Sequence, residues 1–306
     1  MKGLLTIFLI ILNVMALKGQ TPVDALYMNN KQICIAGIYQ NNSWNQYWEG
    51  IEKRDNQNLG SVTHQSALLM GAIGLSSRLN LMVMVPYITS KASQGPFAGQ
   101  KGLQDLSVWL KYKILDHPVK GGKFKGFILG GTSLPISDYV PDYLPLCIGL
   151  QTRTATVRSI FDYHLNNGLY LTLRAGFTNR SNIIIDRNAY QVNGRLLYTQ
   201  EVAIPNVADA GFMVGWRKKA WVTALFLDHF KGISGDDIRP NDMPFPTNKM
   251  IGSSIGTLLK YQGKHWGITC SSSYMIQGRN IGKSRFFQIG GLYLFDSKKG
   301  SKMKAL

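Results

Sequence analysis

Hydrophobic and polar residues alternate along most of the chain, as in the stretch KGLQDLSVWLKYKI, residues 101–114. Every second position from Leu106 to Ile114 is apolar, whereas Asp105 and Lys111 fall on the opposite face. A period of two is the signature of a β-strand with one apolar and one polar face. The pattern therefore predicts a strand here. It leaves open whether the apolar face meets a protein core or lipid.

The same alternation recurs through the chain, and no long stretch holds the 3.6-residue period of a helix. Most of the predicted strands are about 10 residues long, which is the length that a tilted strand needs to cross a bilayer. The chain is therefore expected to be all-β. The twelve predicted strands are residues 31–40, 65–75, 80–89, 103–114, 123–132, 146–164, 169–179, 207–216, 221–231, 251–261, 265–276 and 286–295.

The connections between these strands sort by length. Short connections such as SSRL, LNNG and RKKA follow the even-numbered strands, and longer ones follow the odd-numbered strands. Outer-membrane barrels show this asymmetry, with short periplasmic turns and long extracellular loops. A soluble β-sandwich is the alternative, but its loops have no reason to sort by side. We therefore expect a transmembrane antiparallel β-barrel of about 12 strands, with apolar faces toward lipid and polar faces toward the lumen.

The two ends of the chain read differently from the middle. Lys2, the apolar run Leu4–Leu17 and a short exit have the pattern of a signal peptide, with cleavage expected near Gln20. We therefore expect residues 1–20 to be a signal peptide, residues 21–295 to form the barrel and residues 296–306 to be a basic tail. The last strand ends in an aromatic-rich segment, so the barrel-assembly machinery is an expected partner. The predicted location is the outer membrane of a Gram-negative bacterium.

Composition agrees with a membrane barrel. Charged residues make up 17% of the chain, against about 25% in typical soluble domains. The formal net charge is +17. An exported protein rarely meets nucleic acid, so the charge predicts attraction to anionic lipid headgroups or a cationic lumen that favours anions. No cofactor and no metal site is expected, because the five histidines are scattered without metal-binding spacing.

Two adjacent motifs resemble a known family. The text GAIGLSSRLNLMVMVPYI followed by GLQDLSVWLKYKI is similar to the outer-membrane transporter family of the phenol meta-cleavage pathway type, which is related to the long-chain fatty acid outer-membrane transporters. The resemblance covers residues 71–114. Gly102, Asp105 and Lys111 match the second motif, but Gln104 stands where the family has glycine. The resemblance implies an outer-membrane transporter of small hydrophobic compounds and supplies no substrate.

Charged residues on the polar faces are the candidate site. They could line a pore and guide a polar group, or they could be paired with neighbouring strands or solvated by lumen water. For Asp105, the structural alternatives are a neighbouring arginine or lysine and a cap on the Gly99–Gly102 turn. The candidate pore-lining residues are Asp105, Trp109, Lys111, Arg153, Arg174 and Lys260, with Arg158 on the same predicted lining.

Three features of the loops offer further hypotheses. The aromatic residues Trp44, Tyr47 and Trp48 could receive a hydrophobic solute, or could anchor the barrel at the membrane interface. The acidic loop 236–246 could bind calcium weakly, although a solvated acidic loop is preferred. His64 and Ser66 have the His-x-Ser spacing of outer-membrane phospholipases, but the Asn-Gly that follows in those enzymes is absent.

The expected function is passive uptake or export of small, hydrophobic or anionic compounds, without covalent chemistry. Barrels of 8 strands are filled by their own side chains, whereas 16–18 strands leave an aqueous channel. Twelve strands therefore predict a narrow pore or one closed by inward-folded loops. The alternative is a structural barrel that serves as an envelope scaffold or docking protein, with its lumen filled by side chains.

Overall fold

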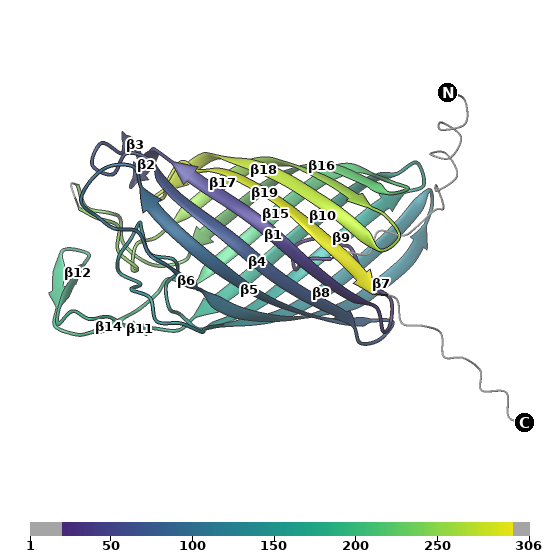
Figure 1. Cartoon of the computed structure of the whole chain (residues 1–306), viewed down its shortest axis with the longest axis horizontal. Helices are drawn as coiled ribbons and strands as arrows, with labels where there is room; N and C mark the ends of the chain where they lie inside the picture. The colour runs from purple at the N-terminus through teal and green to yellow at the C-terminus, as the bar shows by residue number, and fades with distance from the viewer. Residues whose placement is uncertain (1–19, 241, 296–306) are drawn as a thin grey trace, which may run out of the picture.

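Twelve long antiparallel strands close into a barrel in the computed structural model, which describes residues 20–240 and 242–295 (Figure 1). The ring is closed by pairing of the first strand with the last and with the second. The predicted fold class is confirmed. The wall strands are β1 (Ile33–Trp44), β4 (Val62–Gly74), β5 (Leu79–Ala92), β7 (Asp105–Val119), β8 (Gly122–Pro135), β9 (Thr154–Leu165), β10 (Leu169–Arg180), β15 (Val207–Lys218), β16 (Trp221–Gly232), β17 (Ile251–Gln262), β18 (Trp266–Arg279) and β19 (Arg285–Phe295).

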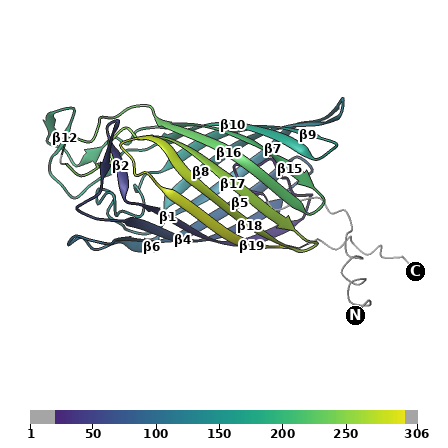
Figure 2. The same ribbon diagram turned by 90° about the horizontal axis from the view of Figure 1, so that it is seen from above.

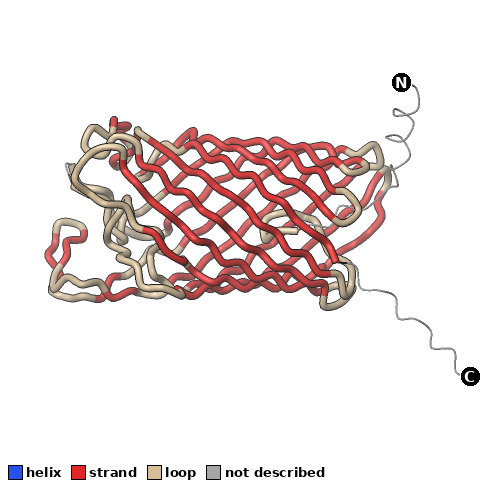
Figure 3. Tube along the Cα trace, in the orientation of Figure 1, coloured by secondary structure: helices blue, strands red, loops and turns tan. Residues whose placement is uncertain are grey.

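The strands cross the barrel obliquely, as Figure 2 shows for β16 to β19, and this tilt is what a closed sheet requires. Figure 3 shows that strand makes up nearly all of the wall and that loops gather at its two ends. Within the described residues no helix is long and apolar enough to cross a membrane. The predicted signal peptide (except Gln20) and the basic tail lie outside the described residues.

The two ends of the barrel differ, as the connection lengths predict. Short turns join the strands at one end, which we call the short-turn end: residues 75–78, 120–121, 166–168, 219–220 and 263–265. The other end, the long-loop end, carries the longer connections and their small strands (Figure 1). These small strands are β2 (Gln46–Glu49), β3 (Glu52–Asp55), β6 (Lys101–Leu103), β11 (Ile183–Ile184), β12 (Tyr190–Val192), β13 (Arg195–Leu197) and β14 (Glu201–Val202).

One predicted strand is wrong at its start. The sixth strand was expected over residues 146–164, but β9 begins at Thr154. The apolar residues before it belong to the loop that precedes β9, where Leu146 is 2% exposed and packs with Leu59 and Val62. Their hydrophobicity therefore serves the packing of the long-loop end and not contact with lipid.

The outer surface of the barrel answers the question raised by the alternation. On β7, Leu110 and Tyr112 are 46% and 44% exposed, whereas Lys111 between them is 0% exposed. A register shift between Lys113 and Leu115 then moves the outward position to Leu115, so the expectation for Ile114 is wrong. Apolar side chains face outward and the polar face of the strand looks inward.

Aromatic side chains stand on the outer surface near both ends of the barrel. At the short-turn end, Trp221 contacts the ring of Tyr261, which in turn contacts the ring of Trp266. Toward the long-loop end, Tyr39, Tyr87, Phe177 and Phe287 are exposed. Two aromatic girdles that flank an apolar band are the surface of a membrane-spanning barrel.

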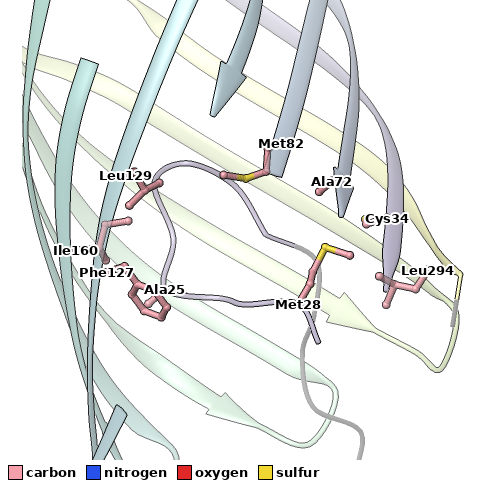
Figure 4. Close-up of a cluster of buried hydrophobic side chains, with 9 residues drawn as sticks. All are labelled: Ala25, Met28, Cys34, Ala72, Met82, Phe127, Leu129, Ile160 and Leu294. Atoms are coloured by element: carbon pink, nitrogen blue, oxygen red, sulfur yellow. The ribbon is translucent and has the colours of Figure 1, made fainter. Parts of the chain in front are cut away.

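A segment of the chain that precedes the first strand lies inside the barrel (Figure 4). We call residues 20–28 the inner segment. Its Ala25 and Met28 are 2% and 0% exposed and pack against the inner wall at the short-turn end. The alternation predicts residues 21–295 as barrel and does not distinguish this segment from the wall. The wall residues of this hydrophobic cluster are Cys34, Ala72, Met82, Phe127, Leu129, Ile160 and Leu294.

A glycine lets the chain turn from the inner segment into β1. A Cβ atom on Gly74 would lie 2.0 Å from the carbonyl oxygen of Asn29. The amide of Lys31 also donates to the carbonyl of Gly74 at 2.7 Å. Because no larger residue fits this approach, Gly74 is required for the turn that returns the chain from the lumen to the wall.

Candidate functional site

Lys111 holds the inner segment. Its side chain is 0% exposed, and its Nζ donates to the carbonyl oxygens of Asp24 at 2.6 Å and Leu26 at 2.8 Å. Longer contacts of 3.4 Å join the same Nζ to the carbonyl of Thr21 and to the carboxylate of Asp24. A buried ammonium is tolerated only when its three donors are satisfied, and here the inner segment supplies the acceptors. Lys111, a candidate pore-lining residue, therefore lies beneath the inner segment.

Arginine–aspartate pairs inside the barrel reach across an intervening strand of the wall. Arg158 on β9 pairs with Asp209 on β15 at 2.9 Å, and Arg174 on β10 pairs with Asp228 on β16. Both arginines also reach the inner segment: Arg158 donates to the carbonyl of Pro22 and Arg174 to that of Val23, at 3.4 and 3.3 Å. The two arginines of the lumen are thus held both by ion pairs with aspartates and by hydrogen bonds to the inner segment.

A third pair lies closer to the short-turn end. Asp162 on β9 is 0% exposed and accepts from Arg217 at 3.2 Å and from the hydroxyl of Thr172 at 2.6 Å. The arginines of β9 and β10 are among the residues predicted to line the pore, whereas Asp162, Asp209 and Asp228 are not. The alternation could have found these aspartates, because each lies on the polar face of its predicted strand.

Glycines make room for two of the pairs. A Cβ atom on Gly211 would lie 2.4 Å from Nε of Arg174 and 2.6 Å from the carboxylate of Asp228. A Cβ atom on Gly176 would lie 2.6 Å from the carboxylate of Asp209. The missing side chains leave the space in which each guanidinium meets its carboxylate.

The lumen contains a cavity of about 350 Å³ beside the inner segment, which we call the inner cavity. Polar groups line one part of it, among them Arg174, Asp228, Lys260 and Gln288. The rest of the wall is apolar, so the cavity offers both kinds of surface to a solute. Apolar side chains that line it include Ile38, Leu68, Met213, Phe226, Leu258 and Phe286.

A second cavity of about 390 Å³, the outer cavity, lies toward the long-loop end. Arg180, Pro205 and Met250 line it, at the points where the wall meets the long loops. Val23, Arg174 and Asp228 line both cavities and so form a common wall between them. The tip of the inner segment and one ion pair therefore separate two spaces that lie along the barrel.

The remaining candidate pore-lining residues lie in different surroundings. Trp109 packs against the hydrophobic cluster of the inner segment, with the guanidinium of Arg158 5.5 Å from its ring. Lys260 lines the inner cavity and is 5% exposed. Arg153 is exposed, lies just before β9 and lines neither cavity. The structure thus brings Arg174 and Lys260 to one cavity and leaves Arg153 outside both.

Asp105 anchors a loop. Its carboxylate accepts from the hydroxyl of Tyr139 at 2.6 Å, and that hydroxyl in turn accepts from the amide of Gln151 at 3.1 Å. Burial and the neighbouring carboxylate raise the pKa of Tyr139 well above its usual value. The partner of Asp105 is therefore a tyrosine and not the arginine, lysine or glycine turn considered from the sequence.

The loop aromatics are packed into the long-loop end. The rings of Trp44 and Tyr47 lie 6.2 Å apart, and Trp48 is 8% exposed. Trp44 also packs against the cluster that contains Leu146. None of the three lines either cavity.

The acidic loop is held by ion pairs and hydrogen bonds. Asp237 accepts from Nε of Arg279 at 2.7 Å and from the side chain of Asn280 at 2.8 Å, and these bonds lower the pKa of Asp237. Asp242 accepts from Arg239 at 2.7 Å, which lowers the pKa of Asp242. Among the described residues, no group of three or more His, Cys, Asp and Glu side chains could hold a metal ion.

The His-x-Ser pair makes no catalytic contact. The ring nitrogen Nε2 of His64 lies 3.3 Å from the carbonyl of Cys147, and the buried hydroxyl of Ser66 has no hydrogen-bond partner. A nucleophilic serine needs its base within hydrogen-bond reach. The arrangement of His64 and Ser66 therefore offers no activated nucleophile.

No family model matches the chain, and no curated protein matches it either. The solved structure of the COG4313 outer membrane channel from Pseudomonas putida F1 is similar over 90% of this chain and 100% of its own length, with a TM-score of 0.74 at 13% sequence identity. The NanC porin, at 11% identity, covers 85% of this chain and 98% of its own. A TodX monoaromatic hydrocarbon channel mutant, at 8% identity, covers 88% of this chain and 91% of its own. The TM-scores of the NanC and TodX structures are low, at 0.45 and 0.44. The first likeness shows that the chain has the fold of an outer-membrane channel, as the resemblance in residues 71–114 implied.

Proposed function

We propose that the protein is a gated, passive channel of the outer membrane for small amphipathic compounds. The observation that carries this proposal is the pair of cavities, about 350 and 390 Å³, that share a wall inside the barrel. A structural scaffold would fill its lumen with interdigitated side chains, and here the lumen is left hollow beside the inner segment. The fold of the channel from Pseudomonas putida supports the same reading.

The inner segment is the gate in this proposal. It is attached to the wall chiefly through backbone carbonyls, which Lys111, Arg158 and Arg174 bind, and through a small apolar cluster. Among the described residues no disulfide bond fixes it to the wall, because Cys34, Cys147 and Cys270 are all free. Movement of the inner segment would join the two cavities to the short-turn end of the barrel.

The lining indicates the kind of solute. Apolar side chains such as Leu68 and Phe226 would accept the body of a small molecule, while Arg174 and Gln288 offer donors to a polar group. The formal charge of +17 would raise the local concentration of anions. Outer-membrane lipid and the barrel-assembly machinery are the other partners that the girdled surface supports, and no step of the proposed passage is enzymatic.

Electrical recording tests the proposal. In planar bilayers with purified full-length protein, Lys111→Met removes the donor to three carbonyls of the inner segment and leaves Asp24 without its ion pair. We expect conductance or open time to rise several-fold, because an unsatisfied buried carbonyl or charge costs about 1–3 kcal/mol.

The matched control is Lys123→Met, which loses the same charge from a lysine bound to Asp116 at 2.7 Å and not to the inner segment. That variant is expected to behave as wild type. A barrel that stays silent as wild type and as Lys111→Met, and that admits no solute in liposome-swelling assays, would contradict the proposal.

A further inference from the structure

The outer cavity contains an arginine that the ion pairs of the lumen do not use. Arg180 is the last residue of β10 and lines this cavity. Its Nη1 makes one long contact, 3.4 Å to the carbonyl of Pro205. Its backbone amide, and not its side chain, donates to Asn206 at 2.8 Å. Within residues 20–240 and 242–295 no carboxylate lies within ion-pair distance of the Arg180 guanidinium.

Its neighbours in the same cavity are different. Arg158 is paired with Asp209 and Arg174 with Asp228. The cavity is thus lined by three arginines and two aspartates, so one positive charge is in excess. The excess charge is that of Arg180, whose guanidinium has no carboxylate partner among the described residues.

The rest of the outer cavity is largely apolar. A cavity of about 150 Å³ is enough to hold benzene, so about 390 Å³ has room for a ring or short chain together with a charged group. A guanidinium presents a planar pair of donors that matches a carboxylate. The apolar lining of the outer cavity includes Val23, Leu150, Val207, Phe230, Pro246 and Met250.

We propose that the outer cavity binds a small monocarboxylate with an apolar body, whose carboxylate pairs with Arg180. The apolar body lies against Phe230 and Met250, and the tip of the inner segment at Val23 closes the inward side. This inference rests on the proposed function, since it names the solute class of the channel. One excess charge selects a monoanion over a dianion.

Binding of benzoate to the purified full-length barrel in detergent tests the inference without any measurement of flux. In isothermal titration we expect Arg180→Gln to weaken benzoate about tenfold or more, as loss of a charge-assisted hydrogen bond implies. Arg180→Lys keeps the charge and is expected to retain part of the affinity. Benzyl alcohol, the uncharged analogue, is expected to bind wild type more weakly and to be insensitive to Arg180→Gln.

The matched control is Arg153→Gln. Arg153 lies close to the end of β10, since its carbonyl accepts from the amide of Ser181 at 2.9 Å, but its exposed side chain does not line the cavity. This variant loses the same charge and is expected to bind benzoate as wild type does. Heat-modifiable migration in gels verifies that each variant forms the barrel. Should Arg180→Gln fail to fold, two other comparisons decide. The inference would be overturned if Arg180→Lys bound benzoate as tightly as wild type does, or if wild type bound benzyl alcohol as tightly as benzoate.

Three results would overturn the inference: no benzoate binding to wild type, equal affinity of Arg180→Gln and Arg153→Gln, or inorganic phosphate binding as tightly as benzoate. The failure of the inference is distinguishable from that of the channel. If the protein conducts solutes but benzoate binding does not depend on Arg180, only the inference is overturned. If the protein binds benzoate through Arg180 but shows no conductance in bilayers, the proposed function is overturned.

Discussion

The two halves of the lumen are built from the same alternating strands and are filled in different ways. At the short-turn end, Met28 of the inner segment shares one buried cluster with Phe127 and Leu294, all 0–1% exposed, and Lys111 is buried there too. Toward the long-loop end, inward positions carry arginines and aspartates around a cavity. The alternation decides which side chains point inward. A separate piece of chain, the inner segment, decides which part of the inside is packed.

The largest expected effect comes from damage to the hydrophobic cluster that the inner segment forms with the wall. Phe127→Ala removes a side chain that is 0% exposed and lies against the ring of Tyr27, at 5.9 Å between ring centres. We expect a loss of about 3–4 kcal/mol in the free energy of unfolding, as for other buried phenylalanines. Denaturant unfolding of the purified barrel in detergent or lipid measures it.

The adjacent residue provides the control. Ile128 faces outward from the same strand and is 46% exposed, so Ile128→Ala should cost clearly less. Equal losses for the two variants would show that the inner segment does not form a packed core with the wall.

The common wall between the cavities is the next place to test. Arg174→Met leaves the carboxylate of Asp228 without its partner and frees the carbonyl of Val23. Removing one member of a buried pair costs about 3 kcal/mol, less where water reaches the site. We expect lower stability together with weaker anion preference in reversal-potential measurements.

A double variant sharpens that prediction. Arg174→Met with Asp228→Leu removes both charges and should recover part of the lost stability, because no unpaired carboxylate remains. If the double variant is as unstable as the sum of the two single ones, the two residues are not coupled across the lumen.

The smallest expected effect concerns the loop beside the outer cavity. The pKa of Asp237 is lowered by its bond to Arg279, so this contribution is present above the usual aspartate pKa of about 4 and is lost as the pH falls through the lower pKa of the folded protein. We expect proteolysis of loop 233–250 to quicken in strong acid. Asp237→Asn should make cleavage faster at neutral pH and nearly independent of pH. Because the pair is exposed, the unfolding free energy of the barrel should barely change.

The wall of the barrel could be predicted because lipid imposes one rule on every strand. Apolar and polar residues must alternate, and the connection lengths then assign each strand a direction. The rule fails where apolar residues serve something other than lipid. Leu146 is apolar because it packs among loops, and Met28 because it packs inside the lumen.

The candidate site was harder to predict for a similar reason. An inward charge such as Arg174 is visible in the pattern, but its partner Asp228 lies 54 residues away, and only the closed sheet brings the two together. Lys111 could be placed on the inward face, yet its partners are backbone carbonyls, which carry no signal in a sequence. Arg153 lies outside β9 because the strand begins later than its alternation suggested.

The position of the inner segment in the chain constrains the order of assembly. The segment precedes β1, and Cys34 of β1 pairs in register with Leu294 of β19, the last strand of the barrel. Both residues pack against the segment's apolar cluster. Pairing of β1 with β19 therefore completes the wall around the apolar cluster of the inner segment. A barrel that closed with residues 20–28 outside would have to open again to admit them.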